Sequence, residues 1–344
     1  LYKGLYIGDH PTPEHNKYLV IILNFSIVDA SLDSYQQGLD DHCNIRFCSF
    51  CDRYSRLLPP ETKDEMNKRT GAIKQLDYLC DVCSELGLKI YLFIDEYDHF
   101  TNKILAEPGC LDAYRQETHG TGYLRLFFDS VKTGTYSSIE RVFVTGVSPV
   151  TMDDLTSGFN IGTNYTLNYE FNEMVGFTEN EVRAMLTYYT DFCNLHKYTV
   201  DELIEIMKPW YDNYCFAEDA YGETTMYNSN MVLYFIDNYV GSKGRLPRNM
   251  VEENIRVDYN KLRMLIHRDK EKPYSIIRQL MDKGSVTGEL ITGFPIEKIT
   301  EYEYFLSLLY YQGVLTISGR YHGMTVFTLP NNSMRMILDY LLAD

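Results

Sequence analysis

Short, almost continuous apolar segments mark the first half of the chain, at Tyr18–Phe25, Lys89–Asp95 and Arg141–Thr145. They are rich in β-branched and aromatic residues, which is typical of strands buried on both faces of a parallel sheet. Thr163–Phe171 has a weaker pattern of the same kind and is predicted as a fourth strand. Helical spacing predicts helices between the strands, over Ser31–Leu57, Glu61–Leu86 and Gly122–Lys132. This alternation predicts an α/β fold with a parallel sheet and helices on both of its faces.

The second half of the chain has helical patterns instead of strands. Thr178 is followed three residues later by Glu181, a capping box that predicts the start of a helix. Helices are predicted over Thr178–Tyr189, Thr199–Lys208, Ser229–Tyr239, Tyr259–Ile266, Pro273–Asp282 and Tyr302–Gln312. Two short strands follow, Val314–Ser318 and Met324–Leu329, and helices followed by such a hairpin predict a winged-helix-like module.

A change of pattern and a polar linker divide the chain into three predicted domains. The α/β domain covers residues 1–175, a helical subdomain covers 176–244, and the winged-helix-like module covers 245–344. The Gly-rich, basic segment Gly241–Arg248 is the predicted linker before the last domain.

Composition narrows the class of protein. Hydrophobic residues make up 45% of the 344 positions, enough for sizeable cores, and the net charge is −16. An acidic chain repels nucleic acid unless a local basic patch compensates. The longest apolar segment, Tyr18–Phe25, is far shorter than the roughly 20 residues of a membrane helix. We therefore expect no membrane association, and since the chain begins at Leu1 and not at methionine, we expect further residues upstream.

The cysteine pairs Cys48/Cys51 and Cys80/Cys83 have a spacing that zinc sites use. Both pairs lie in predicted helices, without a Gly or Pro knuckle, so buried apolar packing is the favoured interpretation. Free thiols indicate a reducing compartment, and we expect the cytoplasm.

The strongest chemical signal is the segment Ile90–Glu96, five apolar or aromatic residues followed by Asp-Glu. A buried strand carries such residues to the carboxyl edge of an open α/β sheet, where ligands bind. This is the Walker B pattern, in which Asp95 holds Mg²⁺ and Glu96 acts as the general base toward the attacking water. The alternative is an ordinary strand that ends in acidic residues.

The next strand supports the nucleotide hypothesis, because Arg141–Ser148 ends in the polar residues Thr145 and Ser148, which are candidates to sense the γ-phosphate. A strand ending in an ordinary Gly-Ser turn is the alternative. The Walker A motif that would supply phosphate-binding amides and a lysine is missing, since the chain contains no Gly-Lys dipeptide. Gly120–Gly122 lacks the lysine and a preceding strand, and is interpreted as a helix start.

Several motifs in sequence order resemble the predicted AAA-ATPase-like family of bacteria. They are Leu1–Leu5, Asp95–Asp98, Thr145–Val150 with Ser157–Asn160, Gly176–Glu179 and Trp210–Tyr214. The resemblance implies a P-loop NTPase-like fold, ATP and Mg²⁺ as cofactors, Walker B roles for Asp95 and Glu96, and a sensor role for Thr145–Ser148. It also implies a Walker A segment upstream and, in many members, a PD-(D/E)XK nuclease-like domain downstream.

The resemblance raises a physical problem. In this class the Walker A strand lies inside the sheet beside the sensor strand, and its loss would leave unpaired backbone groups. The main hypothesis is an ATP-driven conformational switch, inactive in this fragment and active as an ATPase if the upstream Walker A segment is present. The alternatives are a non-catalytic interaction module and a DNA-binding module.

Other residues carry weaker hypotheses. Residues 245–283 hold ten Lys/Arg against six Asp/Glu, including Arg263 and Arg268, so nucleic acid is a candidate partner. Arg125 is a candidate arginine finger, with a solvated surface residue as the favoured alternative. Trp210–Tyr214 is expected to pack helices together. His99 and His119 lack metal-ligand spacing, and the sequence does not predict an oligomeric state.

Overall fold

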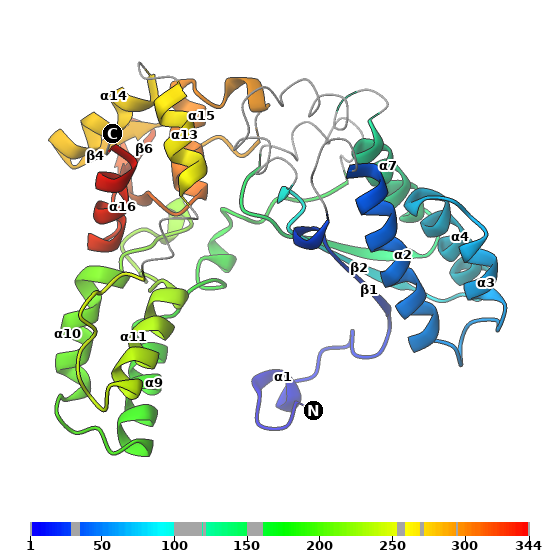
Figure 1. Ribbon diagram of the computed structural model, residues 1–344, viewed down its shortest axis with the longest axis horizontal. Helices are drawn as coiled ribbons and strands as arrows, with labels where there is room; N and C mark the ends of the chain where they lie inside the picture. Colours follow the sequence, from blue (N-terminus) through cyan, green and yellow to red (C-terminus); the bar gives the residue numbers. More distant parts are fainter. Residues whose placement is uncertain are drawn as a thin grey trace. The chain divides into compact units, whose positions relative to one another are not determined.

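The structure is a computed structural model that describes residues 2–28, 35–99, 119, 122–149, 161–252, 259–268, 272–293 and 295–342 (Figure 1). The chain forms two compact units. Unit 1 comprises Leu1–Gly162 and Gly293–Pro295, and unit 2 comprises Thr163–Thr292 and Ile296–Asp344. The three-part division expected from the sequence stays a prediction. Across the described ranges, no helix is both long and apolar enough to cross a membrane.

Unit 1 is built around a parallel sheet of the order β1-β2-β3. Its strands are β1 (Leu19–Asn24), β2 (Ile90–Asp95) and β3 (Ile139–Val144). They coincide with the three apolar segments, which confirms the mixed α/β class and the parallel sheet. In register, Asn24 lies beside Asp95 and Ile94 lies beside Val144, so the three strands end at the same edge. The predicted fourth strand is wrong, because Thr163–Phe171 forms turns and the short 3-10 helix η2 (Tyr169–Phe171).

The helices of unit 1 largely follow the predicted pattern. They are α1 (Tyr6–Asp9), α2 (Tyr35–Arg53), α3 (Thr62–Asn67), α4 (Ala72–Glu85) and α7 (Tyr123–Gly134), with the 3-10 turn η1 (Phe25–Ile27) after β1. The single helix expected over Glu61–Leu86 is wrong, because the chain breaks between α3 and α4. Gly71 has a φ of +92° there, and the Asp40 carboxylate accepts a hydrogen bond from the first amide of α4 at 2.7 Å. Tertiary capping from α2 therefore sets where α4 begins.

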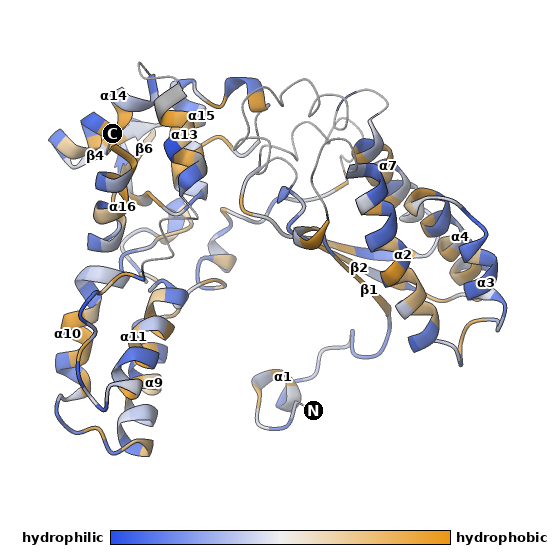
Figure 2. Cartoon of the chain, in the orientation of Figure 1, coloured by the Kyte–Doolittle hydropathy of each residue, from blue (hydrophilic) through white to orange (hydrophobic). Residues whose placement is uncertain are grey.

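The two faces of the sheet differ. Ile21, Leu23, Leu92 and Ile94 alternate along β1 and β2 and are all buried. Figure 1 shows α2, α4 and α7 together on one side of these strands, and both strands are hydrophobic along their length in Figure 2. On the other face Ile22 is 53% exposed and Phe143 is 38% exposed. Parallel strands are normally covered on both faces, so this uncovered apolar face is unusual.

The uncovered face is also aromatic. The rings of Tyr91 and Phe93 stack with centroids 4.2 Å apart, and Phe93 meets Phe143 edge-on at 6.0 Å. Within the described ranges, no strand pairs with the second edge of β3. Unit 1 therefore presents both an apolar face and an open strand edge.

In unit 2, three helices share one hydrophobic core: α9 (Glu179–Phe192), α10 (Val200–Tyr211) and α11 (Ser229–Gly241). The capping box predicted at Thr178 is confirmed. The Thr178 hydroxyl accepts from the Glu181 amide, and the Glu181 carboxylate accepts from the Thr178 amide. Thr199 and Glu202 form a second capping box at the start of α10. These local signals explain why the helix starts were predictable.

The described remainder of unit 2 combines helices with a small antiparallel sheet of the order β4-β6-β5. The elements are η3 (Glu218–Ala220), α13 (Asn260–Arg268), α14 (Lys272–Lys283), β4 (Ser285–Gly288), η4 (Ile296–Lys298), α15 (Tyr302–Tyr311), β5 (Thr316–Tyr321), β6 (Met324–Thr328) and α16 (Asn332–Leu342). The predicted hairpin is present as β5 and β6. The sequence pattern missed β4 and α16, and β4 has only four residues.

The segment Trp210–Tyr214 joins the helices of unit 2 to this sheet module. The Asn213 side chain donates to the carbonyl of Pro330 at 3.0 Å, and the Asn331 side chain donates to the carbonyl of Asp212 at 2.9 Å. The Ser333 hydroxyl donates to the carbonyl of Trp210 at 2.6 Å. These bonds and the complete burial of Tyr211 agree with the expected packing role of the segment.

Candidate functional site

The predicted metal-binding carboxylate, Asp95, lies at the carboxyl edge of the sheet and is half-buried. Its Oδ1 accepts a hydrogen bond from the Thr145 hydroxyl at 2.6 Å and from the Glu96 amide at 3.1 Å. The register of β2 and β3 brings these residues together, because both strands end at the same edge of the sheet and polar residues lie there. The Walker B segment and the sensor segment, separated by some fifty residues in the sequence, therefore meet through one short hydrogen bond.

Asn24, the last residue of β1, completes the support of Asp95. Its Nδ2 donates to Oδ2 of Asp95 at 3.0 Å. The orientation of its amide is fixed, because Oδ1 of Asn24 accepts from the amide of Ser26 at 2.9 Å and from the hydroxyl of Ser26 at 2.6 Å. Each oxygen of Asp95 therefore has a partner, and the partners come from all three strand ends. A polar residue closing an otherwise apolar strand was the signal for Asn24 in the sequence.

The chain turns sharply at Glu96, which has a φ of +56°. This left-handed conformation is uncommon for a residue with a side chain, and it occurs where surrounding contacts impose it. The turn directs the next two residues toward the segment that follows β3. There the amide of Tyr97 donates to the carbonyl of Thr145 at 3.2 Å, and the Tyr97 hydroxyl donates to the carbonyl of Ser148.

Asp98 is fully buried and binds the same segment. Its two carboxylate oxygens accept from the amides of Val147 at 3.2 Å and Ser148 at 2.7 Å. Gly146 lies against this pair so closely that a Cβ atom there would be 2.4 Å from the Tyr97 ring and 2.6 Å from Oδ1 of Asp98. Only glycine fits at this position without a shift of its neighbours.

The predicted site residues thus occupy two neighbouring layers. Asp95, Glu96 and Thr145 are half-buried at the strand ends, whereas Ser148 is only 1% exposed and lies with Asp98 beneath them. The sequence interpretation assigned no individual role to Asn24, Tyr97, Asp98 or Gly146. The repeated aspartate in Asp95–Asp98 was the available signal for the buried layer, but spacing alone did not show that its second member faces another loop.

The first part of the chain matches a known family. Residues 1–156 match the family model described as Predicted AAA-ATPase. The match includes every residue of the two layers, from Asn24 to Ser148. Neither a curated protein nor a solved structure matches the chain.

The site offers oxygen ligands but no cationic side chain. The strand ends and the turns after them, 24–27, 95–99 and 145–149, offer carboxylate, hydroxyl and amide oxygens, which are the ligand types that Mg²⁺ prefers. These turns contain no lysine or arginine. The residues therefore fit a divalent cation, whereas the phosphates of a nucleotide would need a cationic or amide-rich partner from elsewhere.

Three of the four cysteines in the pairs Cys48/Cys51 and Cys80/Cys83 are buried. They lie on α2 and α4, as expected, and the described ranges contain no cluster of three or more metal-ligating His, Cys, Asp or Glu side chains. Burial raises the pKa of the Cys80 and Cys83 thiols to about 12, so both stay protonated near neutral pH. This result favours the packing interpretation of the cysteines.

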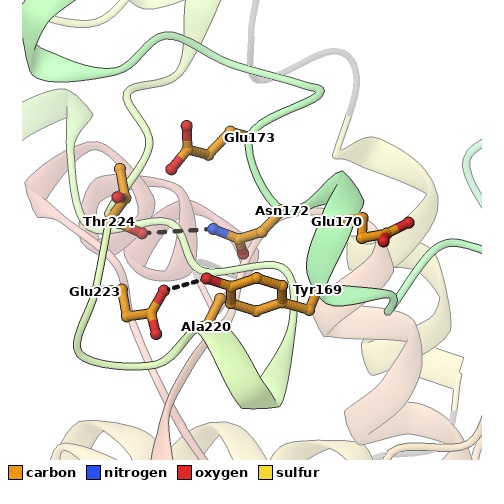
Figure 3. A pocket seen from close by; sticks show the side chains of 7 residues that line it. All are labelled: Tyr169, Glu170, Asn172, Glu173, Ala220, Glu223 and Thr224. Carbon is orange, nitrogen blue, oxygen red and sulfur yellow. Dashed lines mark hydrogen bonds between the residues drawn. The ribbon is translucent and has the colours of Figure 1, made fainter.

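A shallow pocket of unit 2 has the wrong charge for a nucleotide. Glu170, Glu173 and Glu223 line it together with Tyr169, Asn172, Ala220 and Thr224 (Figure 3). The Tyr169 hydroxyl donates to the Glu223 carboxylate at 2.6 Å, which raises the pKa of Tyr169. Three carboxylates in one pocket would repel the phosphates of a nucleotide. The sensor-side motif Ser157–Asn160 and most of Gly120–Gly122 lie outside the described residues.

Proposed function

We propose that the chain is the body of an ATP-dependent conformational switch, with nucleotide and Mg²⁺ bound at the carboxyl edge of the β1-β2-β3 sheet. The observation that carries this proposal is the hydrogen bond between Thr145 and Asp95, because it unites two separate motifs at the edge where open α/β sheets bind ligands. The family match over residues 1–156 supports nucleotide binding as the class of activity.

Each residue has a distinct role in the proposal. Asp95 holds Mg²⁺, directly or through water, and Asn24 and Thr145 orient its carboxylate. Glu96 orients and deprotonates the attacking water, and the left-handed turn sets its direction. Thr145 reports the γ-phosphate through its hydroxyl. Ser148 contributes by its backbone, since its side chain is buried. Mg²⁺ would neutralise charge that develops on the phosphates during transfer.

The open edge of β3 supports a phosphate-binding strand outside the described residues. The connections from β1 to β2 to β3 run in one direction, with their helices on one face. If a strand beside β3 preceded β1 in the chain, its connection to β1 would cross the sheet in the opposite direction, from β3 back to β1. A right-handed crossover would then place its helix on the uncovered face that holds Ile22 and Phe143. A P-loop strand and its helix would thus cover both unusual surfaces of unit 1.

A non-catalytic interaction module is the second candidate, and the same uncovered aromatic face favours it. Such a module would use Ile22, Phe93 and Phe143 to bind a partner and would not need nucleotide. The DNA-binding alternative has less support. Helix α15 contains no lysine or arginine, and most of it is buried. Arg263 lies over the ring of Tyr340 at 5.0 Å and is therefore part of the packing.

The test is thermal unfolding with and without Mg-ATP, on this chain and on a version extended upstream to include the P-loop segment. A ligand that binds only the folded state at a hundred times its dissociation constant adds about 2.7 kcal/mol. We expect stabilisation of the extended version alone. Glu96→Gln in the extended version is expected to keep this stabilisation and to abolish hydrolysis, because it removes the base and keeps the fold.

The outcome separates the two candidates. If neither version responds to Mg-ATP, the switch proposal fails and the interaction module takes its place. If the extended version binds but Asp95→Ala binds Mg-ATP equally well, the metal role of Asp95 is wrong. Asp81→Ala, which removes an exposed carboxylate of α4, is the matched control.

A further inference from the structure

We propose that Asp98 is a positioning residue, which holds the Thr145–Ser148 loop so that the Thr145 hydroxyl reaches Asp95. The inference rests on the proposed function for its catalytic consequence, but its structural part concerns this chain alone. It assigns a purpose to the second aspartate of the Asp95–Asp98 motif and to the glycine of the Thr145–Ser148 motif.

Asp98 can hold two neighbouring backbone amides in place, and these two hydrogen bonds are called the clamp below. An ionised carboxylate only accepts hydrogen bonds, and Asp98 accepts two from consecutive backbone amides. Bonds from backbone N–H groups to a charged acceptor are about twice as strong as neutral ones. Asp98 and Ser148 are 0% and 1% exposed, so the carboxylate and the Ser148 amide would each lose a partner without access to water if they separated. The Ser148 end of the loop is therefore held in place.

The clamp acts on Thr145 through a short path. Thr145 is three residues before Ser148, and its own backbone is fixed on both sides. Its amide donates to the carbonyl of Ile94 at 2.9 Å, and its carbonyl accepts from the amide of Tyr97 at 3.2 Å. Asp98 holds Ser148, and Gly146 packs against Tyr97, so a rotation of the loop would break these contacts. The Thr145 side chain is then directed at Oδ1 of Asp95.

Substitutions at Asp98 separate a positioning role from simple stabilisation. The Asp98→Asn variant keeps one acceptor oxygen, but its side-chain NH₂ group would face a backbone N–H and repel it. Asp98→Ala removes both acceptors. A positioning role predicts graded effects on the loop and on Thr145, with the asparagine variant between the wild type and the alanine variant.

The first experiment uses this chain without ligand, by hydrogen exchange and amide chemical shifts in NMR. In Asp98→Asn we expect the Ser148 and Val147 amides to exchange at least about tenfold faster, since local opening made easier by about 1.4 kcal/mol has that effect. The Glu96 amide, which shares Oδ1 of Asp95 with Thr145, is expected to shift as well. Asp81→Ala is the control and should change neither signal. Unchanged exchange and an unchanged Glu96 amide in a folded Asp98→Asn protein would overturn the proposal.

The second experiment measures hydrolysis in the version extended upstream. A misplaced contact of about 1 Å can lower a rate by about a hundredfold. We expect a fall in kcat of that order in Asp98→Asn, with KM for Mg-ATP changed much less, and a larger fall in Asp98→Ala if it folds. Loss of thermal stability with kcat unchanged would show a structural role only and would also overturn the proposal. Absence of hydrolysis in the wild type contradicts the proposed function, while the exchange experiment still decides the clamp.

Discussion

Two segments that the sequence singled out, one in each unit, have opposite physical characters in this protein. At the sheet edge of unit 1, Asp95, Glu96 and Thr145 remain half-buried, and Thr145 binds Asp95 through its side chain. In unit 2, Trp210–Tyr214 is bound through its carbonyl groups, and the Tyr211 and Tyr214 rings are buried. The first segment leaves polar groups where a ligand can reach them, and the second uses its polar groups internally. A motif in the sequence therefore does not show by itself whether it serves chemistry or packing.

The largest loss of stability is expected from a substitution in the packing segment Trp210–Tyr214. Tyr211→Ala should destabilise unit 2 by about 3–5 kcal/mol, the usual cost of deleting a buried aromatic ring. Tyr211 is 0% exposed, and its hydroxyl also donates to the carbonyl of Met250 at 2.6 Å. Urea unfolding followed by circular dichroism measures the change. Tyr188→Ala, which removes a ring that is 59% exposed on α9, is the control and should cost far less. Equal effects of the two variants would contradict the packing role.

An intermediate loss of stability is expected from a substitution at Gly146, which packs against Tyr97 and Asp98. Gly146→Ala should cost about 1–3 kcal/mol, the range for overpacking, because the new methyl group would overlap the Tyr97 ring and Asp98. Gly241→Ala is the matched control, since a Cβ atom there meets nothing within 4 Å. Chemical unfolding of the two variants measures the difference. If Gly146→Ala is as stable as Gly241→Ala, the close approach of the two loops is wrong.

The smallest expected effect concerns the ion pairs of unit 2. Glu179 binds Lys208 at 3.0 Å and Arg183 at 2.9 Å, and the hydrogen bonds from Lys208 and Arg183 lower the pKa of Glu179 below its ordinary value of 4.5. Because the folded-state pKa is lowered, this contribution is present above the ordinary pKa and is lost as the pH falls through the folded value. Glu179→Gln should cost about 0.2–1 kcal/mol at pH 7, as exposed pairs do. The difference from the wild type should vanish in strong acid, which unfolding at two pH values measures. A difference that persists in acid would contradict the ionic origin.

Local patterns predicted most of the elements. The three parallel strands were visible because each has a run of apolar, β-branched and aromatic residues, and the capping boxes of α9 and α10 mark their helices with side chains close in the sequence. The errors have physical causes. Thr163–Phe171 has apolar residues but no neighbouring strand among the described residues, and Glu61–Leu86 has a helical pattern that Gly71 interrupts.

The sequence by itself determined that two apolar strands lead to the polar residues Asp95 and Thr145, because side-chain type and spacing are local properties. It could not determine that Asn24 faces Asp95, or that Asp98 turns away from the predicted metal site and binds the Val147 and Ser148 amides. Those contacts depend on strand register and on the left-handed turn at Glu96. Tertiary structure alone decided them, since residues far apart in the chain become partners only when the sheet brings their backbones together.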